Sequence, residues 1–465
     1  MVHQISRDPE VQRSLRYSLR DGIAWSLMFG AGESYLQAFA VFLKATTAQM
    51  TLFSALPSLL GSSAQLVSAW VAGRAIPRKV LIFVGVSLQS VAWLPIIALA
   101  FAPFEHSVPL LIGSVVLYYI GGQFAAPPWS SLISDLVPER RRGRFFGRRT
   151  QLMSMMTFAS QTAAGLALDF FERRALAHWG FVLIFAVALG ARLYSLAQLM
   201  RMHEPLARLA PLTLPPLGGL LERMRGSGFA QFALFIAFMN LSVAIASPFF
   251  ALYMLRDLRF SYFEFTTVNA FYVLMQFTAL KLWGRLSDVF GNLRVVQVTS
   301  IVFPVLPIMW VVFPNFWVIL CIQFISGIAW SGFSLAAGNF LYDVVPSEKR
   351  AAYSAVHQTF SNTAIFVGAL IGGALATHAP HELHFAGYSV AFASGLWLAM
   401  SASTLARAAV CAVFLPPLRE TRPVRPISQM ALAIRVLRAN VLTEWLFELL
   451  AGRGRARKNR RARPR

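Results

Sequence analysis

One carboxylate, Glu33, interrupts the apolar stretch DGIAWSLMFGAGESYLQAFAVFL near the start of the chain. The stretch covers residues 21–43, which is long enough to cross a hydrocarbon core about 30 Å thick as a helix. An ionised side chain in that core costs about 2.5 kcal/mol or more, so such side chains usually face a cavity or a partner. At helical spacing, Glu33 shares a face with Ser26, Gly30 and Gln37. We therefore expect this face to line a hydrated cavity.

Two functional roles suit a carboxylate in this position. It could bind and release a proton, because removal from water favours the neutral form of a carboxyl group. It could also pair directly with a cationic solute. The alternative is a structural role, in which Glu33 pairs with a buried cation or with a backbone group. Arg192, which lies inside a later apolar stretch, is a candidate for that cation, or else it packs structurally and reaches an interface.

The composition around these residues is that of a membrane protein. Of the 465 residues, 57% are hydrophobic and 13% are charged, and the mean hydropathy is +0.58, far from the values of soluble domains. The first stretch is too long for a signal-peptide core, and no small-residue cleavage site follows it, so we expect it to be retained. Apolar stretches predict twelve spans, at residues 21–43, 50–72, 80–101, 108–136, 146–171, 179–202, 229–255, 263–283, 295–313, 316–345, 353–377 and 385–415. Prolines should bend or break some of these helices, namely Pro95, Pro127, Pro128, Pro304 and Pro307.

The distribution of basic residues predicts the orientation of the chain. Lys and Arg precede the first span and follow every even-numbered one, whereas the loops APFEHS, FPN and HAPHELH contain neither. Other odd-numbered loops break the pattern, including one with Arg173 and Arg174 and one with Arg256 and Arg259. Cytoplasmic loops retain Lys and Arg. We therefore expect both termini in the cytoplasm and a multi-pass protein of the plasma membrane, the inner membrane in a bacterium.

The net charge of +22 would indicate a nucleic-acid partner in a soluble protein. Here most of the excess lies in the predicted inside loops and in the tail RGRARKNRRARPR. Anionic lipid headgroups are the expected partners of that tail, and nucleic acid is not expected. Apolar residues from Ile427 to Leu449 recur at helical spacing, which predicts an amphipathic helix on the membrane surface. Cys321 and Cys411 fall inside spans and imply neither a disulfide nor a metal site.

The chain also carries an internal repeat. The segment DLVPERRRGRFFG begins at Asp135, and DVVPSEKRAAYSA begins at Asp343. In each, the Asp ends an even-numbered span, Pro stops the helix, and an Arg, either Arg142 or Arg350, opens the next span. Two six-span halves around a site near mid-membrane are the plan of secondary transporters. We expect a cytoplasmic N-terminus (1–20), an N-terminal six-helix bundle (21–202), a central cytoplasmic linker (203–228), a C-terminal six-helix bundle (229–415) and a cytoplasmic amphipathic helix with a basic tail (416–465).

One loop motif resembles that of a known protein family. The segment GRLSDVFGN at 284–292 resembles the major facilitator superfamily, whose loop motif reads Gly, any residue, Leu, any residue, Asp, two residues, Gly. The matching residues are Gly284, Leu286, Asp288 and Gly291. The corresponding first-half loop, WVAGRAIPRKVL, is degenerate, because Arg74 and Pro77 replace the Asp and the second Gly. The resemblance covers residues 21–415 and implies an all-α integral membrane protein with twelve transmembrane helices in two pseudo-symmetric six-helix bundles.

The resemblance also implies gating roles at the cytoplasmic side. In the family, such loop contacts latch the outward-open state. We expect Asp288 to dock against the positive N-terminal end of span five, near residues 144–150. The residues assigned to gating are Gly284, Arg285, Asp288, Gly291, Asp343 and Arg350, with Asp135 and Arg142 acting similarly on the other side. Because Arg74 replaces the first-half Asp, we expect a one-sided latch. The alternative is that these charges only mark topology.

In the same family, spans one, four, seven and ten line a central cavity. The residues that this implies for substrate or proton binding are Glu33, Gln37, Gln123, Asn240, Gln323 and Asn339. Polar residues in spans eight and eleven add Asn269, Gln276 and His357. These residues include several amides and few charged groups, and together with many aromatic and Met side chains they favour an amphipathic or weakly charged solute.

Enzyme motifs are absent from the sequence. There is no Walker-type loop, no His-Glu-x-x-His and no Gly-x-Ser-x-Gly, so we expect neither catalysis nor a cofactor, and an ion gradient as the energy source. The sequence predicts a monomeric secondary active transporter that moves a small organic solute by alternating access, with proton-coupled export as the first hypothesis. Uptake of a sugar or organic acid and lipid flipping are the alternatives within this class. A non-transporting sensor or scaffold is the alternative from another class.

Overall fold

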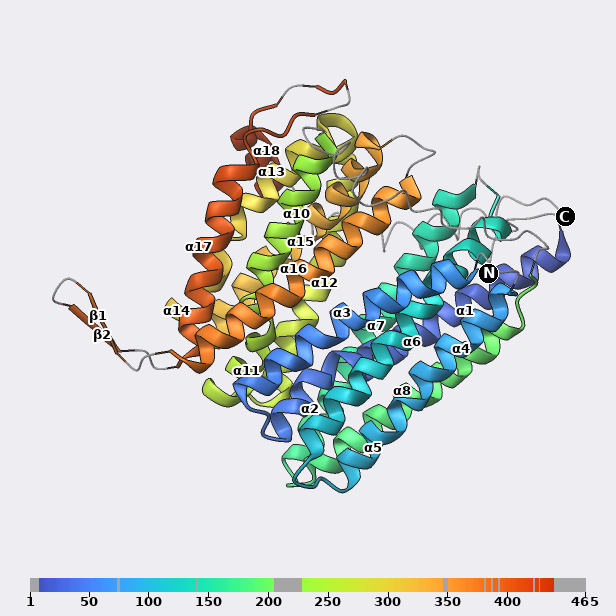
Figure 1. The fold of residues 1–465 in the computed structure, drawn as a ribbon, viewed down its shortest axis with the longest axis horizontal. Helices are drawn as coiled ribbons and strands as arrows, with labels where there is room; N and C mark the ends of the chain where they lie inside the picture. Colours follow the sequence, from blue (N-terminus) through green and yellow to red (C-terminus); the bar gives the residue numbers. More distant parts are fainter. Residues whose placement is uncertain are drawn as a thin grey trace, which may run out of the picture.

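The computed structural model describes residues 8–72, 76–138, 141–204, 228–345, 350–379, 382–385, 388–391, 394–420, 423–425 and 427–438. Within these ranges nearly all regular structure is helical (Figure 1), and a single short hairpin supplies the strands. The predicted all-α class is confirmed. The predicted linker lies almost wholly outside the described residues, as does the tail beyond 438.

The first half of the chain forms the helices coloured blue to green in Figure 1. Its first predicted span is interrupted, because α1 ends at Ala31 and a single 3-10 turn precedes α2. The elements are α1 (Pro9–Ala31), η1 (Glu33–Tyr35), α2 (Leu36–Phe42), α3 (Thr47–Ala72), α4 (Arg78–Val91), α5 (Trp93–Phe101), α6 (Ser107–Leu136), α7 (Arg142–Glu172) and α8 (Ala177–Met200).

The second half forms the helices coloured yellow to red. Its elements are α10 (Gly228–Ala244), η3 (Ser247–Phe249), α11 (Phe250–Leu252), the π-helical η4 (Tyr253–Asp257), α12 (Tyr262–Phe290), α13 (Asn292–Val302), α14 (Val305–Val312), α15 (Phe316–Val344), α16 (Arg350–Thr377), β1 (Glu382–Phe385), β2 (Tyr388–Ala391), α17 (Leu396–Phe414) and α18 (Gln429–Arg438).

The first helix extends beyond its predicted span, and the last predicted span begins too early. The first helix begins at Pro9 rather than near residue 21, because Asp8 caps it by accepting a hydrogen bond from the Glu10 backbone nitrogen (2.8 Å) and proline suits the first helical position. The last long helix begins at Leu396 rather than at residue 385. The residues before it form an antiparallel hairpin in which Leu383 pairs with Val390. Hydropathy alone did not separate these apolar strand residues from the helix that follows.

The predicted helix breaks are partly confirmed. The third predicted span divides into α4 and α5 before Pro95, and the ninth divides into α13 and α14 at Pro304. By contrast, α6 continues through Pro127 and Pro128. These prolines therefore do not break α6, which is one of the helices that stay continuous.

Within the described ranges, nine helical segments are long and apolar enough to cross a membrane. The long helices α1, α7 and α12 are not among the nine. The count of twelve crossings therefore stays a prediction, whereas the helical architecture around it is confirmed.

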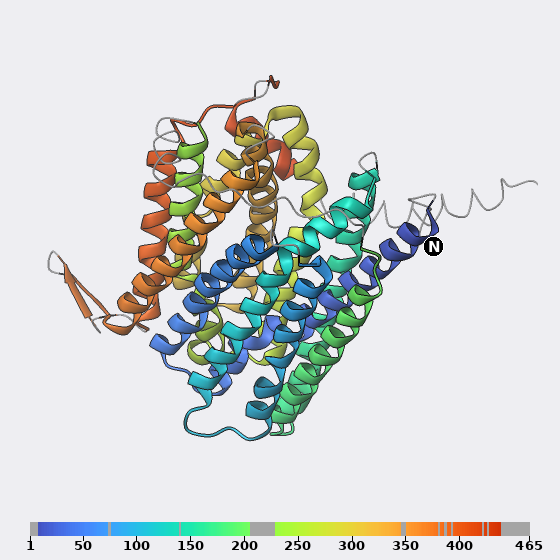
Figure 2. The same ribbon diagram turned by 45° about the vertical axis from the view of Figure 1, so that its right-hand side comes forward.

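The packing of helices repeats between the two halves, which Figure 2 shows from another side. In the first half, α6 packs against α3 and α4, and α1 packs against α7 and α8. In the second half, α15 packs against α12 and α13, and α10 packs against α16 and α17. Each first-half pair corresponds in chain order to a second-half pair. This agreement supports the predicted duplication.

The halves meet along two helix pairs, α3 with α16 and α7 with α12. We call the end that holds the start of α1 the inner end and the opposite end the outer end, following the predicted orientation. The Tyr35 hydroxyl contacts the Gln161 backbone oxygen (2.5 Å) and, across the halves, Thr266 Oγ1 (2.9 Å). The Tyr262 backbone nitrogen donates to Glu172 Oε2 (3.4 Å). These contacts lie toward the outer end, and the ribbons of the halves diverge toward the inner end (Figure 1).

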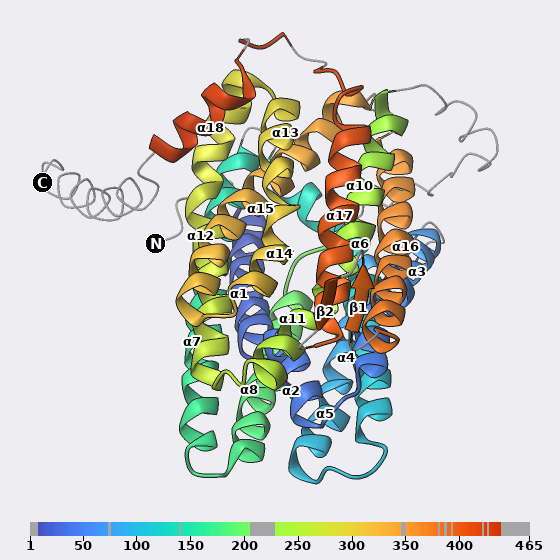
Figure 3. The ribbon, with the colours of Figure 1, turned by 90° about the vertical axis from the view of Figure 1, so that its left-hand side faces the viewer.

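The helix α18 lies at the inner end of the second half, as Figure 3 shows. Its Leu432 is fully buried, whereas Met430 and Ile434 are exposed. The Arg435 guanidinium lies 4.9 Å from the centre of the Phe290 ring. The predicted amphipathic helix is therefore present over the part that the structure describes, with one face packed on the second half.

Candidate functional site

Glu33 stands in the 3-10 turn η1, between α1 and α2. Gly32 permits this turn, since a Cβ there would lie 2.5 Å from the Trp93 ring and 2.6 Å from Ala188. The Glu33 carboxylate accepts hydrogen bonds from the hydroxyls of Tyr118 (2.6 Å) and Tyr119 (2.9 Å), both on α6. Within the described part of the chain, no Lys or Arg forms an ion pair with it. Glu33 is thus held by neutral hydroxyl groups rather than by a cation.

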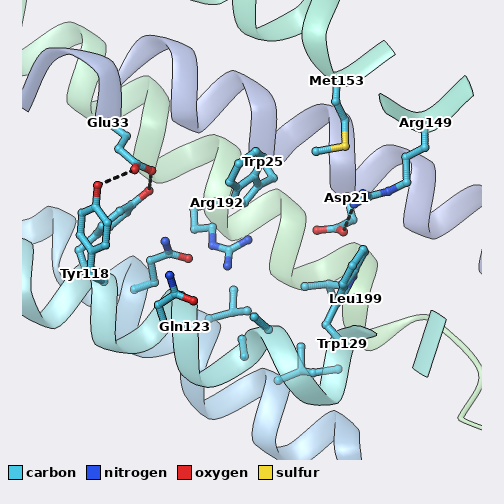
Figure 4. A pocket seen from close by; sticks show the side chains of 17 residues that line it. Asp21, Trp25, Glu33, Tyr118, Gln123, Trp129, Arg149, Met153, Arg192 and Leu199 are labelled. Atoms are coloured by element: carbon cyan, nitrogen blue, oxygen red, sulfur yellow. Dashed lines mark hydrogen bonds and ion pairs between the residues drawn. The ribbon is translucent and has the colours of Figure 1, made fainter. Parts of the chain in front are cut away.

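A cavity of about 350 Å³ lies within the first half, between α1, α4, α6, α7 and α8. We call it the N-half cavity, and Figure 4 shows its side chains. Its charged lining residues are Asp21, Glu33, Arg149 and Arg192. Of these, Asp21 is 4% exposed and Arg192 is 5% exposed. The expectation of few buried charged groups is therefore wrong for this half.

Ser195 links two of these charged groups. Its hydroxyl donates to Asp21 Oδ1 (2.7 Å) and accepts from Arg192 Nη1 (2.9 Å). Asp21 also lies 3.5 Å from Arg149 Nη2, and the Arg149 guanidinium lies 4.6 Å from the centre of the Trp129 ring. Sequence reasoning considered Arg192 but missed Asp21 and Arg149. Asp21 sits at the very edge of the quoted apolar stretch, which was the available signal.

A second cavity, also about 350 Å³, lies between the two halves. We call it the inter-half cavity. Its lining includes Gln37 from α2, Ser247 from η3 and Ala369 from α16. Glu33 and Tyr119 line both cavities. The structure therefore places Glu33 where the N-half cavity meets the inter-half cavity.

The structure places the other predicted binding residues in different positions relative to the two cavities. Gln123 lines the N-half cavity, and Gln37 lines the inter-half cavity. Asn269 instead donates from Nδ2 to the Phe265 backbone oxygen (2.8 Å) on its own helix.

Asn269 lines neither cavity, and the same holds for five further predicted binding residues, namely Asn240, Gln276, Gln323, Asn339 and His357. Asn339 is exposed. His357 Nδ1 is buried and has no hydrogen-bond partner among the described residues. The structure thus brings Glu33, Gln37 and Gln123 together and leaves these five away from the two cavities.

At the inner end of the first half, Asp135 pairs with Arg78, with Oδ2 and Nη1 2.6 Å apart. The Arg78 backbone nitrogen, at the start of α4, donates to Glu204 Oε1 (2.7 Å). Asp135 therefore joins α6 to α4 within its own half. Arg142 opens α7 as predicted, and its side chain lies outside the described residues.

The second half repeats this arrangement. Asn292 Nδ2 donates to Asp343 Oδ2 (2.6 Å), and the Leu293 backbone nitrogen at the start of α13 donates to Glu420 Oε2 (2.9 Å). Asp343 therefore joins α15 to α13 in the same way. Arg350 opens α16 as predicted, and its side chain also lies outside the described residues.

The loop motif of the second half forms the turn between α12 and α13. Gly291 has φ +92°, a conformation that side chains rarely adopt, and an added Cβ would overlap Glu420 Oε2. Gly284 faces Leu335, while Arg285 and Asp288 are exposed. No hydrogen bond or ion pair joins Asp288 to the described part of α7. Among these described residues the contact expected for the latch is not seen, and the latch stays a prediction.

Comparison with known proteins agrees with this architecture. Residues 230–453 match the sequence model of the Major Facilitator Superfamily. A search of curated proteins finds no match.

Several solved structures share the fold. A variant of the nucleoside transporter NupG aligns with a TM-score of 0.64 and 12% identity, over 86% of this chain and 98% of its own. A bacterial homologue of the human lysosomal transporter Spinster, inward-facing and occupied, aligns with a TM-score of 0.65 and 16% identity, over 88% and 97%. A D-xylose-proton symporter aligns with a TM-score of 0.62 and 15% identity, over 89% and 99%.

At these identities the solved structures show the fold alone. The family match, the paired helix bundles and the loop motif agree with one another and with the resemblance seen in the sequence. Residues 230–453 therefore match the major facilitator superfamily in sequence, and the chain has the fold of its membrane transporters.

Proposed function

We propose that this transporter is a proton-coupled secondary active transporter of a small organic solute, with Glu33 as the proton-binding residue. The observation that carries the proposal is the position of Glu33. It lies where the N-half cavity and the inter-half cavity meet, and among the described residues only hydroxyl groups bond to its carboxylate.

Hydroxyl partners suit reversible protonation. A tyrosine hydroxyl donates to a carboxylate and can also accept from a protonated carboxyl group. Tyr118 and Tyr119 can therefore hold Glu33 in both protonation states. An arginine at the same distance would favour the ionised state alone. This difference supports a role in proton coupling over a purely structural role.

We infer that the structure corresponds to an inward-open state. The cross-half hydrogen bonds of Tyr35 and Glu172 lie toward the outer end, and the halves diverge toward the inner end (Figure 1). In alternating access, the outer contacts would break as the inner ends close around the site. The predicted orientation, with both termini in the cytoplasm, makes the inner end cytoplasmic.

Export and uptake differ in how solute and proton share the site. If they bind in turn, the solute moves against the protons, which is the export hypothesis. If they bind together, both move in the same direction, as the name of the D-xylose-proton symporter states for that neighbour. Lipid flipping uses the same two-half plan with a different solute.

Proteoliposome flux with an imposed pH gradient tests the proposal. Radiolabelled uridine, D-xylose and 1-naphthoate serve as probes, and we expect wild type to accumulate at least one of them. Glu33→Gln should retain exchange of that probe at equal concentrations but lose gradient-driven accumulation, because a glutamine side chain cannot carry a proton.

Glu105→Gln is the matched control, since Glu105 is an exposed carboxylate at the outer end that lines neither cavity. It should behave as wild type. Undiminished gradient-driven accumulation by Glu33→Gln would exclude Glu33 from coupling. A wild-type protein that moves none of the probes would favour the non-transporting sensor.

A further inference from the structure

Arg192 on α8 is buried, and its guanidinium makes few hydrogen bonds within the described residues. It is 5% exposed, and its Nη1 donates one hydrogen bond, to the neutral Ser195 hydroxyl (2.9 Å). Its Nε is buried without a partner among the described residues. A guanidinium has five N–H donors, and buried charges are normally paired. Arg192 therefore lines the N-half cavity with most of its hydrogen-bonding capacity unused.

The two carboxylates of the cavity are engaged elsewhere. Asp21 accepts from Ser195 (2.7 Å) and lies 3.5 Å from Arg149. Glu33 accepts from its two tyrosine hydroxyls. Figure 4 shows Arg192 between these two groups, with Glu33 on one side and Asp21 with Arg149 on the other. Within the described residues, neither carboxylate forms an ion pair with Arg192.

The charge of the cavity depends on Glu33. With all four groups ionised, the two carboxylates and the two guanidiniums sum to zero. When Glu33 binds a proton, the sum becomes one positive charge in a site with little water to screen it. A bound anion would then restore neutrality, and Arg192 supplies the unused donors for it.

The other residues that line the cavity indicate what kind of group the anion carries besides its charge. Trp25, Trp129 and Met153 line it together with aliphatic side chains. Trp25 stacks on Phe29, with ring centres 5.3 Å apart. Such walls suit an apolar, preferably aromatic, group.

We propose that the N-half cavity binds an organic monoanion, with its carboxylate on Arg192 and its apolar body against Trp25 and Trp129. This inference rests on the proposed function in one respect, because it takes Glu33 as the proton-binding group. An anion that binds best when Glu33 is protonated travels with the proton. The inference therefore favours uptake over export.

Isothermal titration of the purified full chain with 1-naphthoate and with 1-naphthamide, its neutral analogue, tests the site. Wild type should bind 1-naphthoate at least about tenfold more tightly than 1-naphthamide, since a hydrogen bond to a charged group is worth more than about 1.4 kcal/mol. Arg192→Gln should remove that preference, and Arg192→Lys should retain part of it.

Arg201→Gln is the control, because Arg201 is an exposed arginine just beyond the end of α8. It should bind both probes as wild type does. An unchanged preference for 1-naphthoate in Arg192→Gln would overturn the proposal, as would tighter binding of a cationic probe, 1-naphthylmethylammonium, to wild type.

A second measurement needs no variant, in case Arg192→Gln fails to fold. Phenylglyoxal modifies arginine side chains, and mass spectrometry can follow the modification of Arg192 in wild type. Bound 1-naphthoate should slow modification of Arg192 several-fold and leave that of Arg201 unchanged. Equal rates at Arg192 with and without 1-naphthoate would count against the site.

The pH dependence separates this inference from the proposed function. Wild type should bind 1-naphthoate more tightly at acidic than at neutral pH, because protonation of Glu33, which faces Tyr118, Tyr119 and Arg192, removes a negative charge beside the anion. Glu33→Gln should bind it tightly at both values. Arg192-dependent binding without any effect of pH or of Glu33→Gln would support the anion site and refute Glu33 as the proton site.

Discussion

Asp21 and Glu33 are carboxylates of one continuous segment, and their surroundings assign them different roles. Asp21 is buried beside Arg149 and receives the Ser195 hydroxyl, which in turn binds Arg192. Glu33 meets two phenol hydroxyls. Two nearby cations favour the ionised form of Asp21, whereas the hydroxyls tolerate either form of Glu33. At the scale of residues, these surroundings fit the proposal that Glu33 changes its charge while Asp21 has a structural role.

This assignment predicts that Asp21→Asn destabilises the fold. The substitution leaves the guanidinium of Arg149, whose side chain is 11% exposed, without a carboxylate partner. Breaking a buried ion pair in this way costs roughly 3–5 kcal/mol. The free energy of unfolding in detergent measures the loss.

Asp169→Asn is the matched control for that measurement. Asp169 is also largely buried, but its partner Arg173 has a 73% exposed side chain, and such a pair contributes about 1 kcal/mol or less. Equal losses in the two variants would show that the charges around Asp21 are not coupled.

At the scale of elements, close helix crossings join the halves. Gly165 of α7 faces Thr266 of α12, and Gly373 of α16 faces Thr51 of α3, each so closely that a Cβ would overlap the threonine side chain. Small residues allow such close approach of membrane helices. The outer contact between the halves therefore depends on the absence of side chains at these two crossings.

Gly165→Leu should weaken the outer contact and increase access from outside. A misfit of this kind costs typically about 1–3 kcal/mol, which shifts the equilibrium between closed and open outer ends about fivefold or more. Labelling of Ser247→Cys in the inter-half cavity by a membrane-impermeant thiol reagent, with Cys321 and Cys411 replaced by serine, measures that access.

Gly190→Leu provides the comparison, because a Cβ at Gly190 on α8 meets no atom within 4 Å. Its labelling rate should equal that of the parent protein. If Gly165→Leu also labels at the parent rate, the α7–α12 crossing does not control the outer end.

At the scale of the whole molecule, both halves brace their inner ends in the same way. A carboxylate from beyond the last helix of each half, Glu204 or Glu420, accepts from a backbone nitrogen at the start of α4 or α13. Asp135 and Asp343 hold the same two turns from a neighbouring helix. Each half is therefore braced internally, which suits two bodies that move relative to each other as units. Asp288 remains exposed and available for contact with the other half.

Asp288→Ala should abolish or strongly reduce transport while leaving membrane insertion intact. We propose that this carboxylate docks on the start of α7 when the inner ends close, so its loss affects the closed state. Because Asp288 is exposed here, its removal should change the stability of this state by no more than about 0.5 kcal/mol. Flux in proteoliposomes and the yield of folded protein in membranes measure the two effects.

Glu10→Ala tests whether any exposed inner-end carboxylate would matter equally, since Glu10 is an exposed acid near the start of α1. Transport by this variant should match wild type. Normal transport by Asp288→Ala would refute the latch.

The sequence by itself determined the properties that depend on neighbouring residues along one helix. Hydropathy over about 20 residues predicts the apolar helices, and the repeated Asp–Pro–Arg pattern predicts the duplication and the starts of α7 and α16. The cost of a charge in lipid predicts that Glu33 faces a cavity. The π-helical η4 and the hairpin at 382–391 left no comparable local signal. The hydrogen bond from Asn269 to a backbone oxygen of its own helix was not predicted either.

Only the tertiary structure decided which polar groups meet. Asp21 reaches Arg149, 128 residues away, and Ser195, 174 residues away, because α1 packs against both α7 and α8. The spacing of residues along the chain shows which residues share one face of a helix. The packing of whole helices determines which other residues that face contacts. That packing also buries Arg192 without an ion-pair partner among the described residues. For the same reason, the sequence could place Glu33 at a cavity but could not show that two cavities meet there.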